Sequence, residues 1–347
     1  MTIRHWRATC IQTINHVVNH VSTREDALQI VHRSLDRWIS FIGPIARSTS
    51  KDIRNLVLFP EFAMTGFPVS ESAEEWISKA CIRIPGPETQ RLQEAAQNFG
   101  VFIGANAYEF DPQWPGRYFN CCFLIDPSGD VILKYKRVNT VHSPSPHDFM
   151  DRYFDHYGVE GAFPVVKTEL GNIGMFPCGE IMYPEAARVL MMRGAEVILH
   201  PTSDHGPSGT IGWEQCKRAR AAENMVYLVS CNSGGMTGPL PNNNNMGHSK
   251  IIDYNGNILV SSGGAGESTV ASSLIDVQGL RVLRQEVGPL NRIARQRTEM
   301  YMRVYNEASF YPPNRFVDKT MGSKAEISQI MRETMDRLGA RGVVSKP

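Results

Sequence analysis

The 347-residue sequence has little of several features that mark specialised protein classes. No apolar run approaches the roughly 18 residues that a membrane-spanning helix needs, and the N-terminus lacks the apolar core of a secretory signal. Lys and Arg number 36 against 35 Asp and Glu, so the net charge of +1 favours neither nucleic acid nor a charged membrane as a partner. The seven cysteines include no Cys-x-x-Cys pair, which disfavours a disulfide scaffold and a zinc ribbon and predicts reduced thiols in the cytoplasm.

A phosphate-binding loop is also missing from the sequence. The glycine-rich stretches at 234–238 and 263–266 lack the strand-to-helix context that such a loop requires. We therefore expect no nucleotide cofactor, and we expect no metal centre. What the sequence does have is 42% hydrophobic residues, which is enough for a large buried core.

Short apolar runs rich in β-branched residues alternate along the chain with segments of helical period. Residues 24–42 place apolar side chains on one helical face, and the run at 55–59 is typical of a strand covered on both sides. Hairpins are predicted over 120–135 and 250–260, because each contains a turn of Asp, Asn, Pro, Ser and Gly between two apolar runs.

Each half of the sequence reads strand, helix, strand, helix, strand and hairpin. This repeat predicts an α/β fold: a four-layer αββα sandwich of two mixed sheets with internal pseudo-two-fold symmetry. We expect one domain over 1–280 and a C-terminal helical tail over 281–347, with a Pro-Pro break at 312–313. The tail would be either an arm onto a partner subunit or a cap on its own body, and we favour the arm.

Reactive side chains follow two of the predicted strands. Glu61 stands directly after a buried strand and is ringed by apolar residues, so burial should raise the pKa of its carboxyl as a general base near neutral pH requires. Cys178 lies between Pro177 and Gly179 in a sharp turn before a helix, a geometry that exposes a nucleophile. Each residue also has a structural interpretation, as a helix cap for Glu61 and as a buried core thiol for Cys178.

A basic cluster ends the first hairpin and includes Lys134, Lys136 and Arg137. Such a cluster is usually a solvated strand edge that prevents aggregation. Because side chains alternate along a strand, Lys134 and Lys136 share one face, whereas Tyr135 and Arg137 share the other. Only one of these two sets can face a site.

Taken together, these features resemble the nitrilase superfamily of carbon–nitrogen hydrolases, and within it the aliphatic amidases and formamidases. The resemblance covers roughly residues 5–310. It rests on motifs at 57–62 (VLFPEF), 84–89 (IPGPET), 124–129 (LIDPSG), 183–188 (YPEAAR), 192–196 (MRGAE) and 247–252 (GHSKII). The fold that the resemblance implies is the same αββα sandwich.

The resemblance implies that Cys178 is the nucleophile, that Glu61 is the general base and that the backbone N–H of Gly179 belongs to the oxyanion hole. Members usually read Tyr-Arg-Lys where this chain reads Tyr-Lys-Arg, so an ungapped match makes Arg137 the active-site cation. A one-residue bulge would present Lys136 instead, and Lys134 is the third candidate. Arginine can hold an oxyanion, but it stays charged and does not shuttle a proton.

Other residues are expected to shape the substrate pocket. Glu180 replaces the aspartate that usually stands two residues after the nucleophile, which would reshape the wall beside Cys178. Amidases carry a second glutamate shortly after the catalytic lysine, where it positions the substrate. In this chain that role falls to Asp148, to Asp151, to a histidine of the 139–161 loop, or to none of these. At the end of a later strand, we expect Thr202 to line the pocket. His205 and Trp213 come after it and are interpreted either as pocket walls or as packing or surface residues.

These observations predict a cofactor-independent thiol hydrolase that cleaves a small linear carboxamide and assembles as a homo-oligomer. Nitrile hydrolysis, N-carbamoyl hydrolysis and acyl transfer use the same residues and remain open. A catalytically inactive binding homologue is the alternative from another class, and the presence of both Glu61 and Cys178 argues against it.

Overall fold

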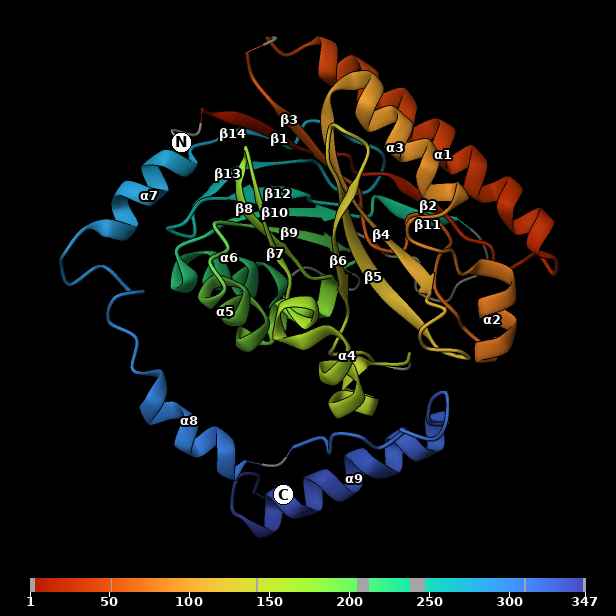
Figure 1. Ribbon diagram of the computed structural model, residues 1–347, viewed down its shortest axis with the longest axis vertical. Coiled ribbons are helices and arrows are strands. Elements are labelled where there is room, and N and C mark those ends of the chain that lie inside the picture. Colours follow the sequence, from red (N-terminus) through yellow and green to blue (C-terminus); the bar gives the residue numbers. More distant parts are fainter. Residues whose placement is uncertain are drawn as a thin grey trace.

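Two six-stranded mixed sheets form the centre of the computed structural model, which describes residues 4–50, 52–141, 143–204, 212–237, 247–308 and 310–345 (Figure 1). The first sheet has the order β14 (Ser272–Ile275), β1 (Trp6–Cys10), β3 (Asn55–Leu58), β4 (Val101–Phe110), β5 (Tyr118–Ile125) and β6 (Val131–Lys136). The second has the order β7 (Val165–Thr168), β8 (Gly171–Met175), β9 (Val197–Thr202), β10 (Tyr227–Asn232), β12 (Lys250–Ile252) and β13 (Ile258–Ser261).

The two sheets repeat one pattern of strand directions. In each, three neighbouring parallel strands (β1, β3 and β4; β8, β9 and β10) are flanked by antiparallel neighbours on both sides. A small parallel pair, β2 (Ile14–His16) and β11 (Gly235–Thr237), lies outside both sheets. The repeated strand order agrees with two similar halves, whereas the pseudo-two-fold axis itself stays a prediction.

Helices cover the outer faces of the two sheets (Figure 1). On the first sheet lie α1 (Arg24–Arg47) and α3 (Pro87–Phe99), and on the second lie α5 (Pro184–Met192) and α6 (Trp213–Asn224). The apolar face predicted for residues 24–42 is buried in α1, where Trp38 stacks on Phe59 with ring centroids 4.2 Å apart. The predicted four layers are thus confirmed.

The inner faces of the sheets meet in a close-packed core. Gly104 of β4 lies at this interface, where an added Cβ would be 2.7 Å from Leu58 of its own sheet and 3.3 Å from Leu199 of the opposite sheet. A larger residue would require these leucine side chains to shift, because protein cores have little spare volume. The remaining helices are α2 (Ala73–Ala80), α4 (Met150–Ala162), α7 (Val277–Gln285), α8 (Thr298–Glu307) and α9 (Lys324–Ala340), with short 3₁₀ helices η1 (Pro146–Phe149) and η2 (Cys178–Met182).

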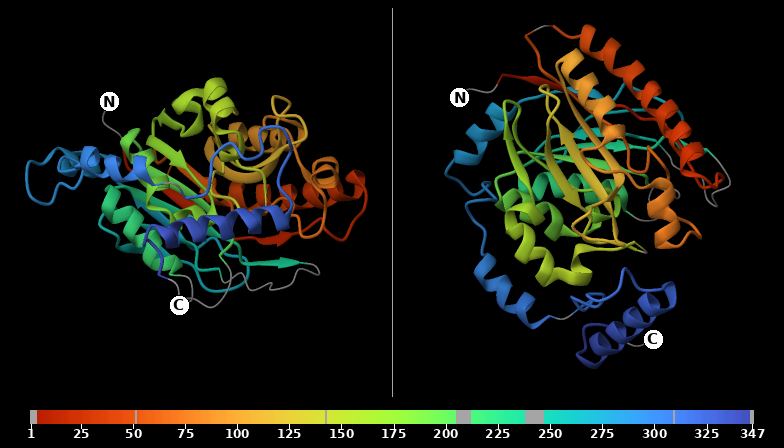
Figure 2. Two further views of the ribbon diagram at one scale, coloured as in Figure 1. Left: turned by 90° about the horizontal axis from the view of Figure 1, so that it is seen from below. Right: turned by 45° about the vertical axis from the view of Figure 1, so that its right-hand side comes forward.

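The C-terminal tail leaves the body at α7 and runs around it through α8 to α9 (Figures 1 and 2). The predicted boundary at residue 280 falls inside α7, and further helical segments follow it at α8 and α9. Arg117 donates hydrogen bonds of 2.8–3.0 Å to the carbonyls of Phe316, Val317 and Lys319, which ties the tail to its own body. None of the helices described here is both long enough and apolar enough to cross a lipid bilayer.

Candidate active site

Glu61 lies immediately beyond the end of β3 and its side chain is fully buried (0% exposed). Its Oε1 accepts hydrogen bonds from Asn120 Nδ2 (2.8 Å) and Arg137 Nη1 (3.0 Å), and its Oε2 accepts one from Ser203 Oγ (3.1 Å). Burial raises the pKa of the Glu61 carboxyl, and the positive charge of Arg137 offsets only part of that rise. This carboxylate is therefore oriented and more basic than an exposed glutamate.

Cys178 begins η2, and its backbone has a φ of +44°, a left-handed conformation that residues with a side chain rarely adopt. His200 of β9 stabilises this turn, because its Nε2 donates a 2.9 Å hydrogen bond to the Cys178 carbonyl. Burial lowers the pKa of His200 to about 3, so the imidazole is neutral and its Nδ1 accepts from the Ser230 hydroxyl (2.9 Å). Strained backbone of this kind is concentrated at functional sites.

The Cys178 thiol, on a side chain only 7% exposed, lies close enough to the Glu61 carboxylate for each group to influence the pKa of the other. Burial raises the pKa of this thiol to about 12, and the negative charge of Glu61 adds to the rise. The positive charge of Arg137 and the backbone N–H of Ser203 oppose the rise. The resting pair is consequently a protonated thiol beside a carboxylate that can take its proton.

Arg137 is the cation that the structure brings to Glu61. The register of β6 against β5 runs without interruption from Leu133 to Lys136, and the N–H of Arg137 continues it by donating to the Asn120 carbonyl (2.9 Å). Arg137 therefore keeps the face that strict alternation predicts, and no bulge presents Lys136 in its place. Burial works against the charge of Arg137, but its acidic neighbours raise the pKa of the guanidinium, which stays protonated.

Lys134 and Lys136 lie on the opposite face of β6, which corrects the two alternatives that placed either lysine beside Glu61. Lys136 Nζ donates to Asp111 (2.6 Å) and lies 3.5 Å from Glu109, while Lys134 Nζ donates to Glu109 and to the Ile84 carbonyl (2.8 Å). Two buried acids on and beside β4 thus neutralise both lysines away from the site.

Gly179 leaves room for the guanidinium beside the cysteine turn. A Cβ built on Gly179 would be only 2.9 Å from Nη2 of Arg137, closer than real Cβ atoms approach their neighbours. Arg137 therefore lies against the peptide that follows Cys178, where the resemblance puts the oxyanion hole. The guanidinium of Arg137 therefore lies between two parts of the site: its Nη1 donates to Glu61, and its Nη2 lies beside Gly179 in the turn that carries Cys178.

Glu180, expected to shape the pocket wall, turns away from Cys178 toward the end of β6. It is fully buried, and its Oε1 accepts hydrogen bonds from the Tyr135 hydroxyl (3.0 Å) and from the N–H groups of Val138 (3.0 Å) and Asn139 (2.9 Å). The structure thus places this carboxylate behind the site and in contact with the segment that carries Arg137.

A carboxylate, a thiol and a cation thus converge at the ends of β3, β8 and β6. Comparison with known proteins identifies the family. A family model described as carbon-nitrogen hydrolase matches residues 26–285, which is most of the sequence. The chain belongs to the carbon–nitrogen hydrolase family. Family membership accordingly gives it the hydrolysis of carbon–nitrogen bonds as its class of chemistry.

Relatives within the carbon–nitrogen hydrolase family are distant. Mouse (Mus musculus) omega-amidase NIT2 is 26% identical over 263 residues, covering 74% of this chain and 88% of the relative, and a probable nitrilase of Schizosaccharomyces pombe is 26% identical over 255 residues, covering 74% and 87%. The crystal structure of Saccharomyces cerevisiae Nit3, a member of branch 10 of the nitrilase superfamily, has a TM-score of 0.64 at 21% identity over 84% of this chain and 97% of that one. An amidase from Nesterenkonia sp. has a TM-score of 0.60 at 19% identity, covering 88% and 98%.

Sequence reasoning missed three polar residues at this carbon–nitrogen hydrolase site. Asn120 and Ser203 both hold Glu61, and His200 holds the Cys178 turn. Asn120 also accepts a 2.6 Å hydrogen bond from Asn106, whose own oxygen accepts from the N–H of Phe62. The only sequence signal was a polar residue inside or directly after a buried strand, where an unpaired polar group would be costly.

Three residues expected in the pocket make the following contacts among the described residues. The Thr202 carbonyl accepts from the N–H groups of Glu61 (3.3 Å) and Ser233 (3.2 Å), so Thr202 braces the backbone. Trp213, the first residue of α6, is partly buried against the hydrophobic core. Asp148 caps η1 by accepting from the N–H of Ser145 (2.9 Å), and its carbonyl accepts from Phe316 of the tail. His205 lies outside the described residues.

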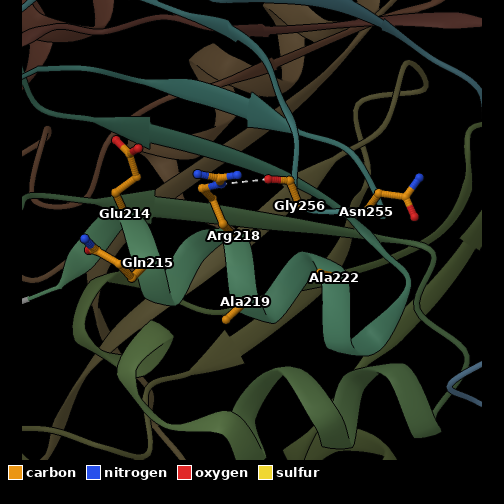
Figure 3. A pocket seen from close by; sticks show the side chains of 7 residues that line it. All are labelled: Glu214, Gln215, Arg218, Ala219, Ala222, Asn255 and Gly256. Carbon is orange, nitrogen blue, oxygen red and sulfur yellow. Dashed lines mark hydrogen bonds between the residues drawn. The ribbon is translucent and has the colours of Figure 1, made fainter.

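Two hollows on the described surface have linings that include neither Cys178 nor Glu61. One of about 390 Å³ runs along α6, where Arg218 donates a 2.8 Å hydrogen bond to the carbonyl of Gly256 on the β12–β13 turn (Figure 3). Another of about 710 Å³ lies between β2 and α1 and includes His16, His20 and Arg33. The described residues hold no group of three or more His, Cys, Asp and Glu side chains that could bind a metal ion.

Proposed function

We propose that this carbon–nitrogen hydrolase is an amidase that releases ammonia from a small linear carboxamide through a thioester on Cys178. The observation that carries this proposal is the pairing of a protonated, buried thiol with an oriented carboxylate of raised pKa. A thiol and a base within hydrogen-bonding reach are the signature of nucleophilic catalysis. The relatives named omega-amidase and amidase support the same reaction class.

In the acylation half-reaction, Glu61 takes the proton from the Cys178 sulfur as that sulfur attacks the amide carbon. A carbon–sulfur bond forms, and the carbonyl oxygen becomes an oxyanion. Glu61 then gives the proton to the amide nitrogen as the carbon–nitrogen bond breaks. Ammonia leaves, and an acyl thioester remains on Cys178.

In the deacylation half-reaction, a water attacks the thioester carbon while Glu61 accepts one of its protons. The carbon–sulfur bond breaks, the proton returns to sulfur, and a carboxylic acid is released. Glu61 therefore acts as a base and then as an acid in each half-reaction, so a pKa nearer neutrality than that of an exposed glutamate suits it.

Arg137 and the N–H of Gly179 are proposed to stabilise the oxyanion. The guanidinium already lies against the Gly179 peptide, so little reorganisation is needed as negative charge develops on oxygen. Because arginine stays protonated, Arg137 supplies charge but leaves proton transfer to Glu61. The Ser203 hydroxyl and the Asn120 amide keep the carboxylate turned toward the sulfur.

The test is a screen of short aliphatic amides, nitriles and N-carbamoyl amino acids for ammonia release, followed by acid quenching and mass spectrometry of the active substrate. We expect turnover of an amide and an acyl adduct on the peptide that contains Cys178. We expect Cys178→Ala to abolish both, with a loss of kcat on the order of 10⁴ or more. Cys231→Ala, which removes another buried thiol, should retain activity.

The same screen separates the alternatives. Turnover of nitriles or carbamoyl compounds alone would move the proposal to another branch of the same chemistry. Full turnover by Cys178→Ala would refute the thioester. A properly folded protein that neither turns over any compound nor forms an adduct would favour the inactive binding homologue.

We also propose that the protein is a homo-oligomer whose tail contributes to the interface. None of the residues of α8 is buried, although five of its ten side chains are large and apolar: Met300, Tyr301, Met302, Val304 and Tyr305. Exposed apolar surface of this kind commonly marks a protein–protein contact.

A further inference from the structure

Glu180 connects the turn that carries the nucleophile to the strand end that carries the cation. It is the third residue of η2, two residues after Cys178. All three donors to its Oε1 come from the end of β6, from the hydroxyl of Tyr135 and from the backbone of Val138 and Asn139. These donors stand on both sides of Arg137 in the sequence, so one carboxylate oxygen holds the Tyr135 side chain before the guanidinium and the backbone after it.

The orientation of Arg137 depends on this tie. Its Nε donates a 2.8 Å hydrogen bond to the carbonyl of Asn139, whose N–H is one of the groups that Glu180 holds. With Nε fixed on Asn139, Nη1 reaches Glu61 at 3.0 Å and Nη2 lies beside Gly179. Loss of the Glu180 contacts would free Asn139 and, with it, the guanidinium.

Glu180 also adds a second negative charge beside Arg137. Its Oε2 is buried and has no hydrogen-bond partner among the described residues, so this charge is balanced mainly through space by the guanidinium. Burial raises the pKa of the Glu180 carboxyl, and Arg137 is the largest opposing influence. One buried cation therefore faces two buried carboxylates, Glu61 and Glu180.

We propose that Glu180 is a positioning residue that fixes Arg137 and remains its counter-charge while Glu61 carries the proton of Cys178. This inference rests on the proposed function, in which Glu61 becomes neutral during each half-reaction. At that moment Arg137 would be a buried cation without an ion-pair partner, which is costly, were Glu180 absent. With Glu180 present, the guanidinium keeps one carboxylate and can turn its hydrogen bonds to the oxyanion.

The charge of Glu180 also makes Glu61 a better base, because it weakens the hold of Arg137 on the Glu61 carboxylate. The other ionisable groups near this pair are neutral: burial raises the pKa of Tyr108, Cys122 and Tyr135 well above their usual values. Around Cys178, the groups that contribute charge or titrate are His200, Asp204 and Lys217, and Asp204 is paired with Lys217.

The decisive variant is Glu180→Gln, which keeps the shape and the accepting oxygen but removes the charge. In the full-length chain we expect kcat to fall about tenfold or more with KM nearly unchanged. Without the charge of Glu180, Arg137 has no carboxylate partner while Glu61 is neutral, and its guanidinium is no longer held ready to donate hydrogen bonds to the oxyanion. The acidic limb of the kcat/KM profile should move to lower pH, since Arg137 then lowers the pKa of Glu61 more strongly. A merely structural carboxylate would leave that limb in place.

The matched control is Glu109→Gln, another buried acid hydrogen-bonded beside β6 but on its far face. It should lower the melting temperature without moving the limb. Glu180→Asp keeps the charge and shortens the reach, so kcat should fall while the limb stays. If Glu180→Gln does not fold, Glu180→Asp decides the matter, and an unchanged kcat in it overturns the inference.

A readout without substrate separates this inference from the proposed function. Alkylation of Cys178 by iodoacetamide should be faster in Glu180→Gln than in the parent at equal pH, since one negative charge near the sulfur is gone. Faster alkylation in a protein that hydrolyses nothing would support the charge coupling and refute the hydrolase proposal. An active parent in which neither the limb nor the alkylation rate responds to Glu180→Gln would overturn the inference alone.

Discussion

At the scale of single residues, the site is defined by how burial changes ordinary side chains. Neither the thiol of Cys178 nor the carboxylate of Glu61 is unusual in itself. Exclusion of water raises the pKa of both, and their contact couples the two protonation states. Two predictions follow from these residues and their immediate neighbours.

The pH dependence of activity should show one limb. Glu61 must be deprotonated to act, and its pKa is raised, so kcat/KM should fall as pH decreases through a value above that of an ordinary glutamate. Because the thiol has a pKa of about 12, its ionisation should cause no break across the neutral and moderately alkaline range. A profile measured at constant ionic strength checks this, and a bell with an alkaline pKa near 8 would contradict it.

Gly179→Ala should displace Arg137 without unfolding the protein. The new methyl group would approach Nη2 within 2.9 Å, so the guanidinium must leave its position beside the turn. We expect kcat to fall by about 10² to 10³, the usual cost of losing an oxyanion-stabilising donor. Steady-state kinetics with a melting curve is the measurement. Activity within twofold of the parent would show that the guanidinium does not need this space.

At the scale of elements, the end of a strand decides which chemistry is available. Glu61, Cys178 and Arg137 each follow a strand, and the first two follow parallel strands of different sheets, β3 and β8. Ligand sites of α/β proteins lie beyond the carboxyl ends of such strands. The turn η2 then depends on β9, whose His200 holds the carbonyl of Cys178.

His200→Ala should weaken both the turn and the reaction. It leaves the Cys178 carbonyl and the Ser230 hydroxyl without a partner in a buried place, a cost of about 1–3 kcal/mol in stability. The strained φ of Cys178 would relax, so kcat should fall at least about tenfold while Glu61 and its pH limb remain. Chemical denaturation and kinetics measure the two effects. His200→Gln, which can still donate to the carbonyl, should recover part of each, and an equal loss in both variants would rule out the hydrogen bond as the cause.

At the scale of the whole molecule, the tail relates the single chain to its assembly. It is attached to its own body at Arg117 and at Glu185, which accepts a 2.7 Å hydrogen bond from Tyr305. Its helix α8 nevertheless leaves apolar side chains exposed. The tail therefore combines contacts to its own body with a surface suited to a second copy.

Light scattering should give a mass that is a multiple of 38.8 kDa. The double change Met300→Glu and Val304→Glu alters two side chains of α8 that are 69% and 68% exposed and one helical turn apart, so it should reduce the mass toward a single chain. Val270→Glu, at a position 64% exposed outside the tail, is the matched control and should leave the mass unchanged. A monomeric parent would refute the assembly.

The local pattern of the sequence was sufficient for the layers of the fold, because apolar periodicity and turn residues act over a few positions. It put Arg137 and Lys136 on opposite faces of β6. The resemblance to the nitrilase superfamily, rather than the local pattern, implied that Glu61 and Cys178 share one site. The local pattern missed the short edge strand β14 and the helix α4, whose formation depends on distant partners.

Which face of β6 meets the thiol was decided only by the tertiary structure. Alternation allows either set of side chains to face the site. The choice depends on Glu109 and Asp111, in and beside β4, which form ion pairs with Lys134 and Lys136 on the other face. The same holds for Glu180, His200 and Ser203, whose roles arise from contacts between segments far apart in the chain. A sequence determines the types of residues at strand ends. Burial and ion pairing across the fold determine which of their charged groups can take part in the reaction.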